Sequence, residues 1–178
     1  MQDAKKFLIP LASATLFVII GSVLGYSLTK KSPKSSIETV TSPLFPKKAK
    51  KLITVGETKV FIEIADDPKE WQIGLSEHKS LGASEGMLFI FDRKDTMPSF
   101  WMEGMDFDID IIWINDGKVT QVEQNVPKPN LDTPSSELPL YQPYDVIDYV
   151  LEVNAGYVKE EGIAVGDNVD FSQLEENN

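Results

Sequence analysis

The chain has 178 residues, no cysteine and a formal net charge of −11. The absence of cysteine excludes disulfides, thiolate metal sites, a cysteine nucleophile and a lipid-modified N-terminal cysteine. The acidic charge disfavours nucleic acid as a partner, because phosphate binding needs a basic surface.

The charge is divided unevenly along the chain. Residues 1–59 hold ten lysines and three acidic residues, whereas residues 60–178 hold seven basic and twenty-five acidic residues. A basic, partly apolar N-terminal part followed by an acidic domain is typical of a protein held at a membrane surface. We predict four parts: an N-terminal transmembrane anchor or signal segment (1–29), a basic Lys/Pro/Ser tether (30–56), a globular β-rich domain (57–171) and a disordered tail (172–178).

An apolar segment close to the N-terminus predicts contact with the lipid bilayer. Residues 7–28 contain no charged side chain. A helix of this length, rising about 1.5 Å per residue, just spans a hydrocarbon core of about 30 Å. The alternative is a signal peptide that is cleaved after Ser27, since Gly25 and Ser27 form a small-x-small pair.

The lysines that flank this segment point to two opposite orientations. Their number near the two ends favours a cytoplasmic C-terminal side. A short N-terminus with two lysines before an apolar run instead resembles an export signal. We predict a membrane-anchored protein whose globular domain is extracytoplasmic, and a cleaved, secreted domain is the alternative.

Alternating apolar residues predict that the globular domain begins with a strand at 59–65. Asp67 and Pro68 then indicate the start of a short helix, with an acid at the N-cap and proline in the first turn. This helix is expected to end near Gly74.

Further strands and turns follow in chain order. Residues 86–91 form an apolar run that is too short for a helix and suggests a buried strand. The Asn-Asp-Gly sequence at 115–117 is a strong hairpin signal, because these residues tolerate positive φ. Five prolines make 127–145 a long loop, and 157–161 fits a short helix. The other predicted strands are 99–102, 107–114, 118–126, 146–153 and 163–171.

About seven short strands and two short helices place the domain in the α+β class, with β structure dominant. Strands outnumber helices, and no long helix alternates with them. The expected fold is a compact, curled, barrel-like sheet that is antiparallel or mixed.

Short motifs follow one another in a distinctive order along this domain. They are Gly-Leu at 74–75, Glu-Gly-Met-Leu-Phe at 85–89, Phe-Trp-Met at 100–102, Asp-Ile-Ile at 110–112, Asn-Val-Pro at 125–127, Tyr-Val-Leu-Glu-Val-Asn-Ala-Gly at 149–156, Gly-Ile at 162–163 and Val-Gly-Asp at 165–167. This order resembles the uncharacterised family numbered 192 among the domains of unknown function, over about residues 57–171. The resemblance implies a small prokaryotic, mostly β domain, often anchored or exported, without an assigned activity or catalytic residues.

The chain departs from that family pattern at three places. Glu-Gly-Met at 103–105 replaces the usual Lys-Asn-Thr, Asp108 replaces a proline, and His78 stands near the position of a common arginine. A family ligand site that uses those residues would therefore be altered in this chain.

Four carboxylates gather in a short stretch: Glu103, Asp106, Asp108 and Asp110. In a strand, the three aspartates share one face. Oxygen-rich clusters suit Ca²⁺ or Mg²⁺, so Asp106, Asp108 and Asp110 are the metal candidates. A solvated strand edge explains the same pattern, and we predict no metal and no cofactor.

Four residues are candidates for binding a ligand. Trp101 could line a cleft, although aromatic residues in a short strand usually pack in a core. Asp110 shares a strand face with apolar residues, so it is expected to be partly buried and bonded to backbone N–H groups or, alternatively, to a ligand. Asn125 and Tyr141 could form a rim on the proline-rich loop.

The sequence contains no nucleophile–base pair that we can recognise. We therefore predict a non-catalytic binding or accessory domain on the outer face of the membrane, with an envelope protein or a glycan as partner and no nucleic acid. The alternative is a carboxylate-dependent hydrolase, or a divalent-metal-binding domain, that acts on cell-surface polymer. Enzyme activity and oligomeric state stay open.

Overall fold

The structure is a computed structural model that describes residues 49–175, all within one compact unit, Ser42–Asn178. The predicted anchor and most of the predicted tether lie outside the described residues. Within the described residues, no helix is long and apolar enough to cross a membrane.

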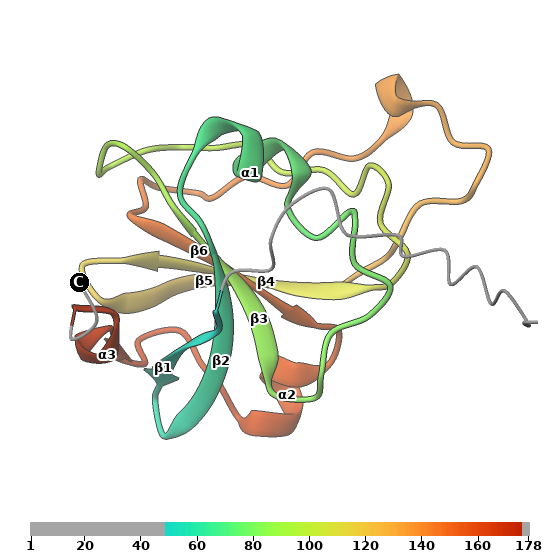
Figure 1. Ribbon diagram of the computed structural model, residues 1–178. Helices are drawn as coiled ribbons and strands as arrows, with labels where there is room; N and C mark the ends of the chain where they lie inside the picture. The colour runs from blue at the N-terminus through green and yellow to red at the C-terminus, as the bar shows by residue number, and fades with distance from the viewer. Residues whose placement is uncertain (1–48, 176–178) are drawn as a thin grey trace, which may run out of the picture. The chain divides into compact units, whose positions relative to one another are not determined.

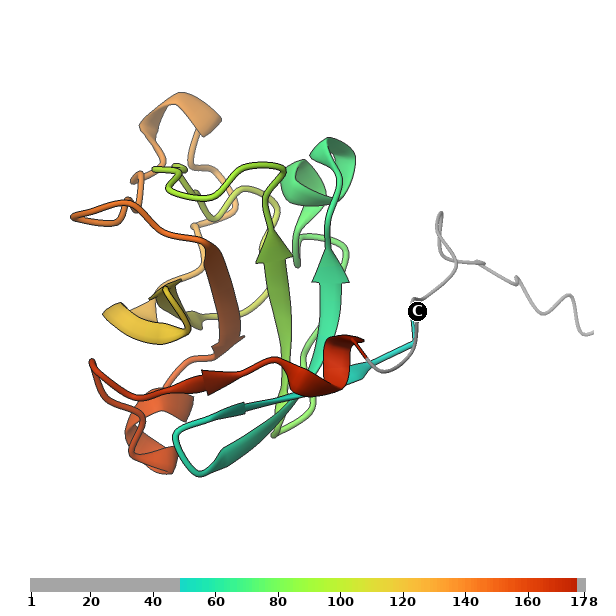
Figure 2. The same cartoon turned by 90° about the vertical axis from the view of Figure 1, so that its left-hand side faces the viewer.

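Seven strands form one mixed sheet in the order β5-β4-β6-β3-β2-β1-β7 (Figure 1). Among the described strands, β2 and β3 run parallel and the other neighbouring pairs are antiparallel. A bridge between Lys118 and Asn168 brings the end strands together, so the sheet is a nearly closed barrel (Figure 2). The strands are β1 (Lys51–Val55), β2 (Thr58–Ala65), β3 (Glu85–Ile90), β4 (Ile109–Asn115), β5 (Lys118–Val126), β6 (Tyr149–Asn154) and β7 (Val169–Asp170).

Short helices cover the ends of the curled sheet. α1 and α2 lie at opposite ends, and the long loop that carries η1 lies at the same end as α1 (Figures 1 and 2). α3 packs beside β1. The helices are α1 (Pro68–Ile73), η1 (Ser135–Glu137), α2 (Tyr157–Glu161) and α3 (Ser172–Glu175).

The two faces of the sheet build two apolar cores, because successive strand residues point to opposite faces. The inner core fills the barrel with side chains from all seven strands, among them Leu88, Ile112 and Leu151. The outer core holds residues of the opposite parity, such as Phe89 and Trp113, and is covered by α1 and by loops.

The predicted fold class is confirmed, and so are the elements with strong local signals. Asp116 and Gly117 both have positive φ, 48° and 66°, as the hairpin between β4 and β5 requires. Asp67 caps α1, and α2 covers the predicted residues 157–161.

Four expectations about secondary structure need correction. β1 lies in the segment assigned to the tether 30–56, where lysines before and within it concealed the buried residues Ile53 and Val55. The expected strand 163–171 is reduced to β7, because its first half turns at Gly166, where φ is 100°. A third helix, α3, occupies the first residues of the predicted tail.

The fourth correction concerns residues 99–102, which do not form a regular strand. Only Phe100 makes a β-bridge, to Tyr141. Pro98 lies two residues before Phe100 and Pro143 two residues after Tyr141. Neither proline has an N–H, so the pairing cannot extend there into a ladder.

Candidate functional site

A pocket of about 400 Å³ lies between α1, with the turn that follows it, and the loop of residues 98–105. Its lining is mostly apolar and includes Met102 and Met105. Among the residues that the structure describes, two ionisable side chains line it, those of Glu103 and Glu152. The aromatic lining residues are Trp71, Phe89, Phe91, Phe100 and Trp101.

Local hydrogen bonds hold the α1 wall of the pocket in place. The Asp67 carboxylate accepts hydrogen bonds from the backbone N–H groups of Lys69 and Glu70, at 2.8 and 2.9 Å, and so begins the helix. One turn later, Trp71 Nε1 donates to the carbonyl oxygens of Ala65 and Ile90, at 3.1 and 3.0 Å. These oxygens belong to the last residues of β2 and β3, so the indole is fixed to the sheet.

Aromatic packing holds the opposite wall. The ring of Phe100 meets Phe89 edge-to-face, with centroids 4.9 Å apart, and meets Trp113 in the same way at 5.6 Å. Edge-to-face contacts of this kind stabilise the packing of the rings by more than the burial of their surface alone. Contacts within the chain itself therefore hold both walls of the pocket.

Glu152 is the buried acid of this pocket. It lies on β6 between Met87 of β3 and Ile111 of β4, and its exposed fraction is 6%. Its carboxyl group has no hydrogen bond or ion pair within residues 49–175. Burial raises the pKa of Glu152 to about 8, so the group is mostly neutral at pH 7.

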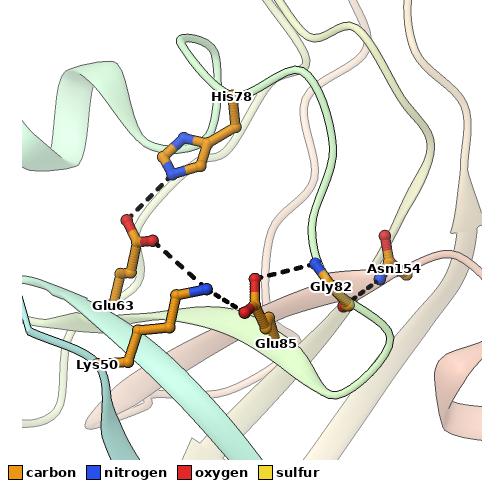
Figure 3. Close-up of polar contacts among 6 residues, drawn as sticks. All are labelled: Lys50, Glu63, His78, Gly82, Glu85 and Asn154. Atoms are coloured by element: carbon orange, nitrogen blue, oxygen red, sulfur yellow. Dashed lines mark hydrogen bonds and ion pairs between the residues drawn. The ribbon is translucent and has the colours of Figure 1, made fainter. Parts of the chain in front are cut away.

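Glu63 lies in the same row as Glu152, the row of residues in register across β2, β3 and β6, but it has the basic partners that Glu152 lacks. Glu63 pairs with Met87 from the other side and has a similar exposed fraction, 9%. Its carboxylate lies 3.0 Å from His78 Nε2 and 3.9 Å from Lys50 Nζ (Figure 3). Lys50 also forms an ion pair with Glu85, so basic side chains surround this end of the row.

Asp110 has a structural role at the opposite face of the sheet. Its side chain is fully buried. Oδ1 accepts hydrogen bonds from the backbone N–H groups of Asn125, at 2.7 Å, and Gly156, at 3.1 Å, and Oδ2 accepts one from Val158 at 3.0 Å. The carboxylate thus joins the end of β5 to the start of α2, which is the expected bonding to backbone N–H groups.

The four predicted ligand residues do not converge on one cleft. Trp101 lines the pocket and is 47% exposed. Tyr141 pairs through its backbone with Phe100, behind the pocket wall, and burial, with the negative charge of Glu123, raises the pKa of Tyr141. Asp110 and Asn125 lie together near α2 and do not line the pocket.

The predicted aspartate cluster is divided among separate partners. Asp106 accepts a hydrogen bond from Lys79 Nζ at 2.6 Å, and this bond and the lysine charge lower the pKa of Asp106. Asp108 accepts one from the backbone N–H of Lys128 at 2.8 Å. Within the part of the chain that the structure describes, no three His, Cys, Asp or Glu side chains are grouped as metal ligands.

Sequence reasoning missed Glu152, although it lies in the motif at 149–156. The signal that could have found it is the strand face on which its side chain lies. It shares a strand face with Val150 in an otherwise apolar run, so an interior strand would bury its carboxyl group. The neighbours that make β6 an interior strand come from distant parts of the chain.

Comparison with known proteins assigns the family. The family model of DUF192, described as an uncharacterised ACR, matches residues 51–171. The chain therefore belongs to this family, as its motifs suggested. A comparison with curated proteins gives no match.

Two solved structures share the fold. One, from Sinorhizobium meliloti 1021, is described as a proposed transcription regulator; it is 27% identical, has a TM-score of 0.61 and covers 71% of this chain and 96% of its own. The other, from Novosphingobium aromaticivorans DSM 12444, is a protein of unknown function; it is 26% identical, also has a TM-score of 0.61 and covers 67% of this chain and 84% of its own.

Proposed function

We propose that this protein is a non-catalytic binding module, displayed on the outer face of a membrane, whose ligand enters the pocket between α1 and the loop of residues 98–105. One observation carries this proposal: the Glu152 carboxyl group lines a preformed apolar pocket and has no partner within residues 49–175. An unpaired buried carboxyl group is costly for the fold. A ligand that forms a hydrogen bond or an ion pair with Glu152 would explain why the fold keeps a buried carboxyl group without a partner.

The form of the pocket supports binding. Ligand sites are mostly apolar concavities that hold a few polar groups to fix orientation. A carboxyl group with a strongly shifted pKa in such a concavity marks a functional-site candidate. The Glu152 pocket combines both properties, and its aromatic walls are held by contacts within the chain.

The pocket offers less support for hydrolysis. A carboxylate-dependent hydrolase needs a second carboxylate that is free to attack or to activate water. The other acid in the lining, Glu103, is exposed and accepts a hydrogen bond from Ser135 Oγ. The other carboxylates of the stretch 103–110, Asp106, Asp108 and Asp110, are engaged by Lys79, Lys128 and α2.

Nucleic acid is a weaker candidate, even though one relative is described as a proposed transcription regulator. The chain carries a net charge of −11, and acidic surfaces repel phosphate. We therefore propose an envelope protein or a glycan as the partner, with the lipid bilayer contacted through residues 7–28.

A ligand screen tests the pocket proposal. Full-length protein in detergent is screened by thermal shift against a library of amines, carboxylic acids, amides, sugars and short peptides. We expect hits that are lost in Ser99→Trp, which fills the pocket rim, and kept in Ser80→Trp, an exposed position outside the lining. A screen without hits, or hits that both variants retain equally, would overturn the proposal.

Cell fractionation tests the membrane proposal separately. We expect the full-length chain in the membrane fraction and its globular domain to be digested when protease is added to intact cells. Full-length, unprocessed protein in the soluble fraction would contradict a membrane anchor. A protease-resistant domain in intact cells, digested only after lysis, would contradict outer-face display.

A further inference from the structure

We propose that the ligand of the Glu152 pocket is an organic cation, an ammonium group with small apolar substituents, held by Glu152 and enclosed by the aromatic walls. This inference rests on the proposed function and names the ligand class of the same site. The group could belong to a free amine or to a lysine side chain of a partner, and the experiment below separates these sources.

The charges around the pocket select a cation. Within residues 49–175, the ionisable residues that line it are Glu103 and Glu152, and no lysine, arginine or histidine of this part of the chain does so. Such an arrangement gives the cavity a negative potential once Glu152 ionises, which favours positive ligands over neutral and negative ones.

The aromatic walls suit the same ligand. A cation within about 6 Å of a ring centroid is attracted by the negative face of the ring, most strongly by tryptophan. Trp71 and Trp101 both line the pocket, one fixed to the sheet and the other half-exposed. Alkylated ammonium groups gain most from such walls, because their methyl groups also bury apolar surface.

The missing partner of Glu152 is the third argument. Glu63, in the same row of the sheet, has the positive charge of Lys50 Nζ 3.9 Å from its carboxylate and His78 Nε2 at 3.0 Å. Glu152 receives none within residues 49–175, and its strand neighbours are the apolar Met87 and Ile111. A bound ammonium ion would give Glu152 the counter-charge that the chain itself gives Glu63.

Cation binding should be coupled to the release of a proton. Burial raises the pKa of Glu152 to about 8, so this carboxyl group is mostly protonated at neutral pH until a cation binds. An ammonium ion pairs with the ionised form, and Glu103 is the other titratable group that lines the cavity. Affinity should therefore rise by about tenfold per pH unit below pH 8 and level off above it.

Calorimetry with matched probes tests this inference on full-length protein in detergent. Choline is compared with its neutral isostere 3,3-dimethylbutan-1-ol, and n-butylammonium with butan-1-ol. We expect each cation to bind at least about tenfold more tightly than its neutral partner. Titrations in two buffers of different ionisation enthalpy should show release of about one proton per cation at pH 7.

Variants show whether Glu152 is responsible. Glu152→Gln should lose at least about tenfold in cation affinity and all of the proton release, whereas the exposed control Glu57→Gln should keep both. To distinguish the sources, an acetylated Ala-Lys-Ala peptide amide is compared with n-butylammonium. Tighter binding of the peptide supports a protein side chain, and tighter binding of the free amine supports a small-molecule ligand.

Two results would overturn the inference of a cationic ligand without contradicting the proposed binding function of the pocket. One is equal or tighter binding of the neutral isosteres. The other is failure of all the cations, while the library screen yields an acid, an amide or a sugar that Ser99→Trp excludes. If cations bind but Ser99→Trp and Glu152→Gln leave the affinity unchanged, both the inference and the proposed pocket are wrong.

Discussion

Asp110 and Glu152 lie on neighbouring strands and face opposite sides of the sheet, since Asp110 is in register with Val153, the residue after Glu152. Both carboxyl groups are buried. Asp110 accepts three backbone hydrogen bonds, whereas Glu152 has no polar partner within residues 49–175. The first group therefore stabilises the fold, and the second is available for a ligand.

Replacing the first carboxylate should destabilise the domain. Asp110→Asn places an NH₂ group among N–H donors and leaves at least one of them unsatisfied. We expect a loss of about 2–4 kcal/mol in the free energy of unfolding, measured by urea denaturation. Asp108→Asn is the control, because the Asp108 carboxylate is exposed and accepts one hydrogen bond from a backbone N–H group. We expect this variant to lose much less free energy of unfolding. Equal losses in the two variants would contradict the role given to Asp110.

The second carboxyl group should make stability depend on pH. The pKa of Glu152 is raised from 4.5 to about 8 in the fold, so between these values the folded state holds more protons than the unfolded state. This contribution is most favourable below pH 4.5 and is lost as the pH rises to about 8, by roughly 1.4 kcal/mol per pH unit.

A variant isolates this dependence. Glu152→Gln should match the wild type near pH 5 and exceed it increasingly up to pH 8, in urea denaturation at each pH. Glu57→Gln, an exposed change in the β1–β2 turn, should follow the wild type throughout. A Glu152→Gln protein whose stability falls with pH as steeply as that of the wild type would show that this carboxyl group is already ionised.

The centre of the sheet should not tolerate a side chain at Gly86. A Cβ there would lie 2.6 Å from the carbonyl oxygen of Glu152 and 3.0 Å from Val153 Cγ1. We expect Gly86→Ala to cost about 3 kcal/mol or more in the free energy of unfolding. Gly82→Ala is the control, because the atoms that it meets belong to the flexible side chain of Glu85. If Gly86→Ala melted at the wild-type temperature, the close packing of β3 against β6 would be refuted.

Trp101 should contribute to binding rather than to stability. It is 47% exposed and lines the pocket, so Trp101→Ala should change the free energy of unfolding by less than about 1 kcal/mol. The same change should weaken choline binding by about threefold, through the loss of a cation–π contact at a half-exposed site. Tyr144→Ala, another exposed aromatic residue outside the lining, should leave affinity unchanged. Equal effects of the two variants on affinity would remove Trp101 from the site.

Local signals in the sequence predicted much of the fold. The Asn-Asp-Gly turn, the Asp67 cap and the strand at 59–65 were predicted from residues close together in the chain, and the structure confirms all three. The expected bonding of Asp110 to backbone N–H groups also followed from its parity beside Ile112. β1 was missed because Lys51 and the lysines before it dominate the composition of that segment.

The pocket could not be predicted in the same way. Its inner acid, Glu152, is buried only because β3 and β4 flank β6, and these pairings join residues far apart in the chain. Its outer wall depends on the bridge between Phe100 and Tyr141, which two prolines confine to one residue pair. When a residue is buried by strands that are distant in the chain, its sequence neighbours give little indication of that burial.

Glu152 should present a neutral carboxyl group to the apolar pocket at neutral pH. A ¹³C NMR titration of the Glu152 side-chain carboxyl carbon, assigned by its loss in Glu152→Gln, measures this directly. We expect a single inflection near pH 8. An inflection near pH 4.5, the ordinary value for glutamate, would contradict the account.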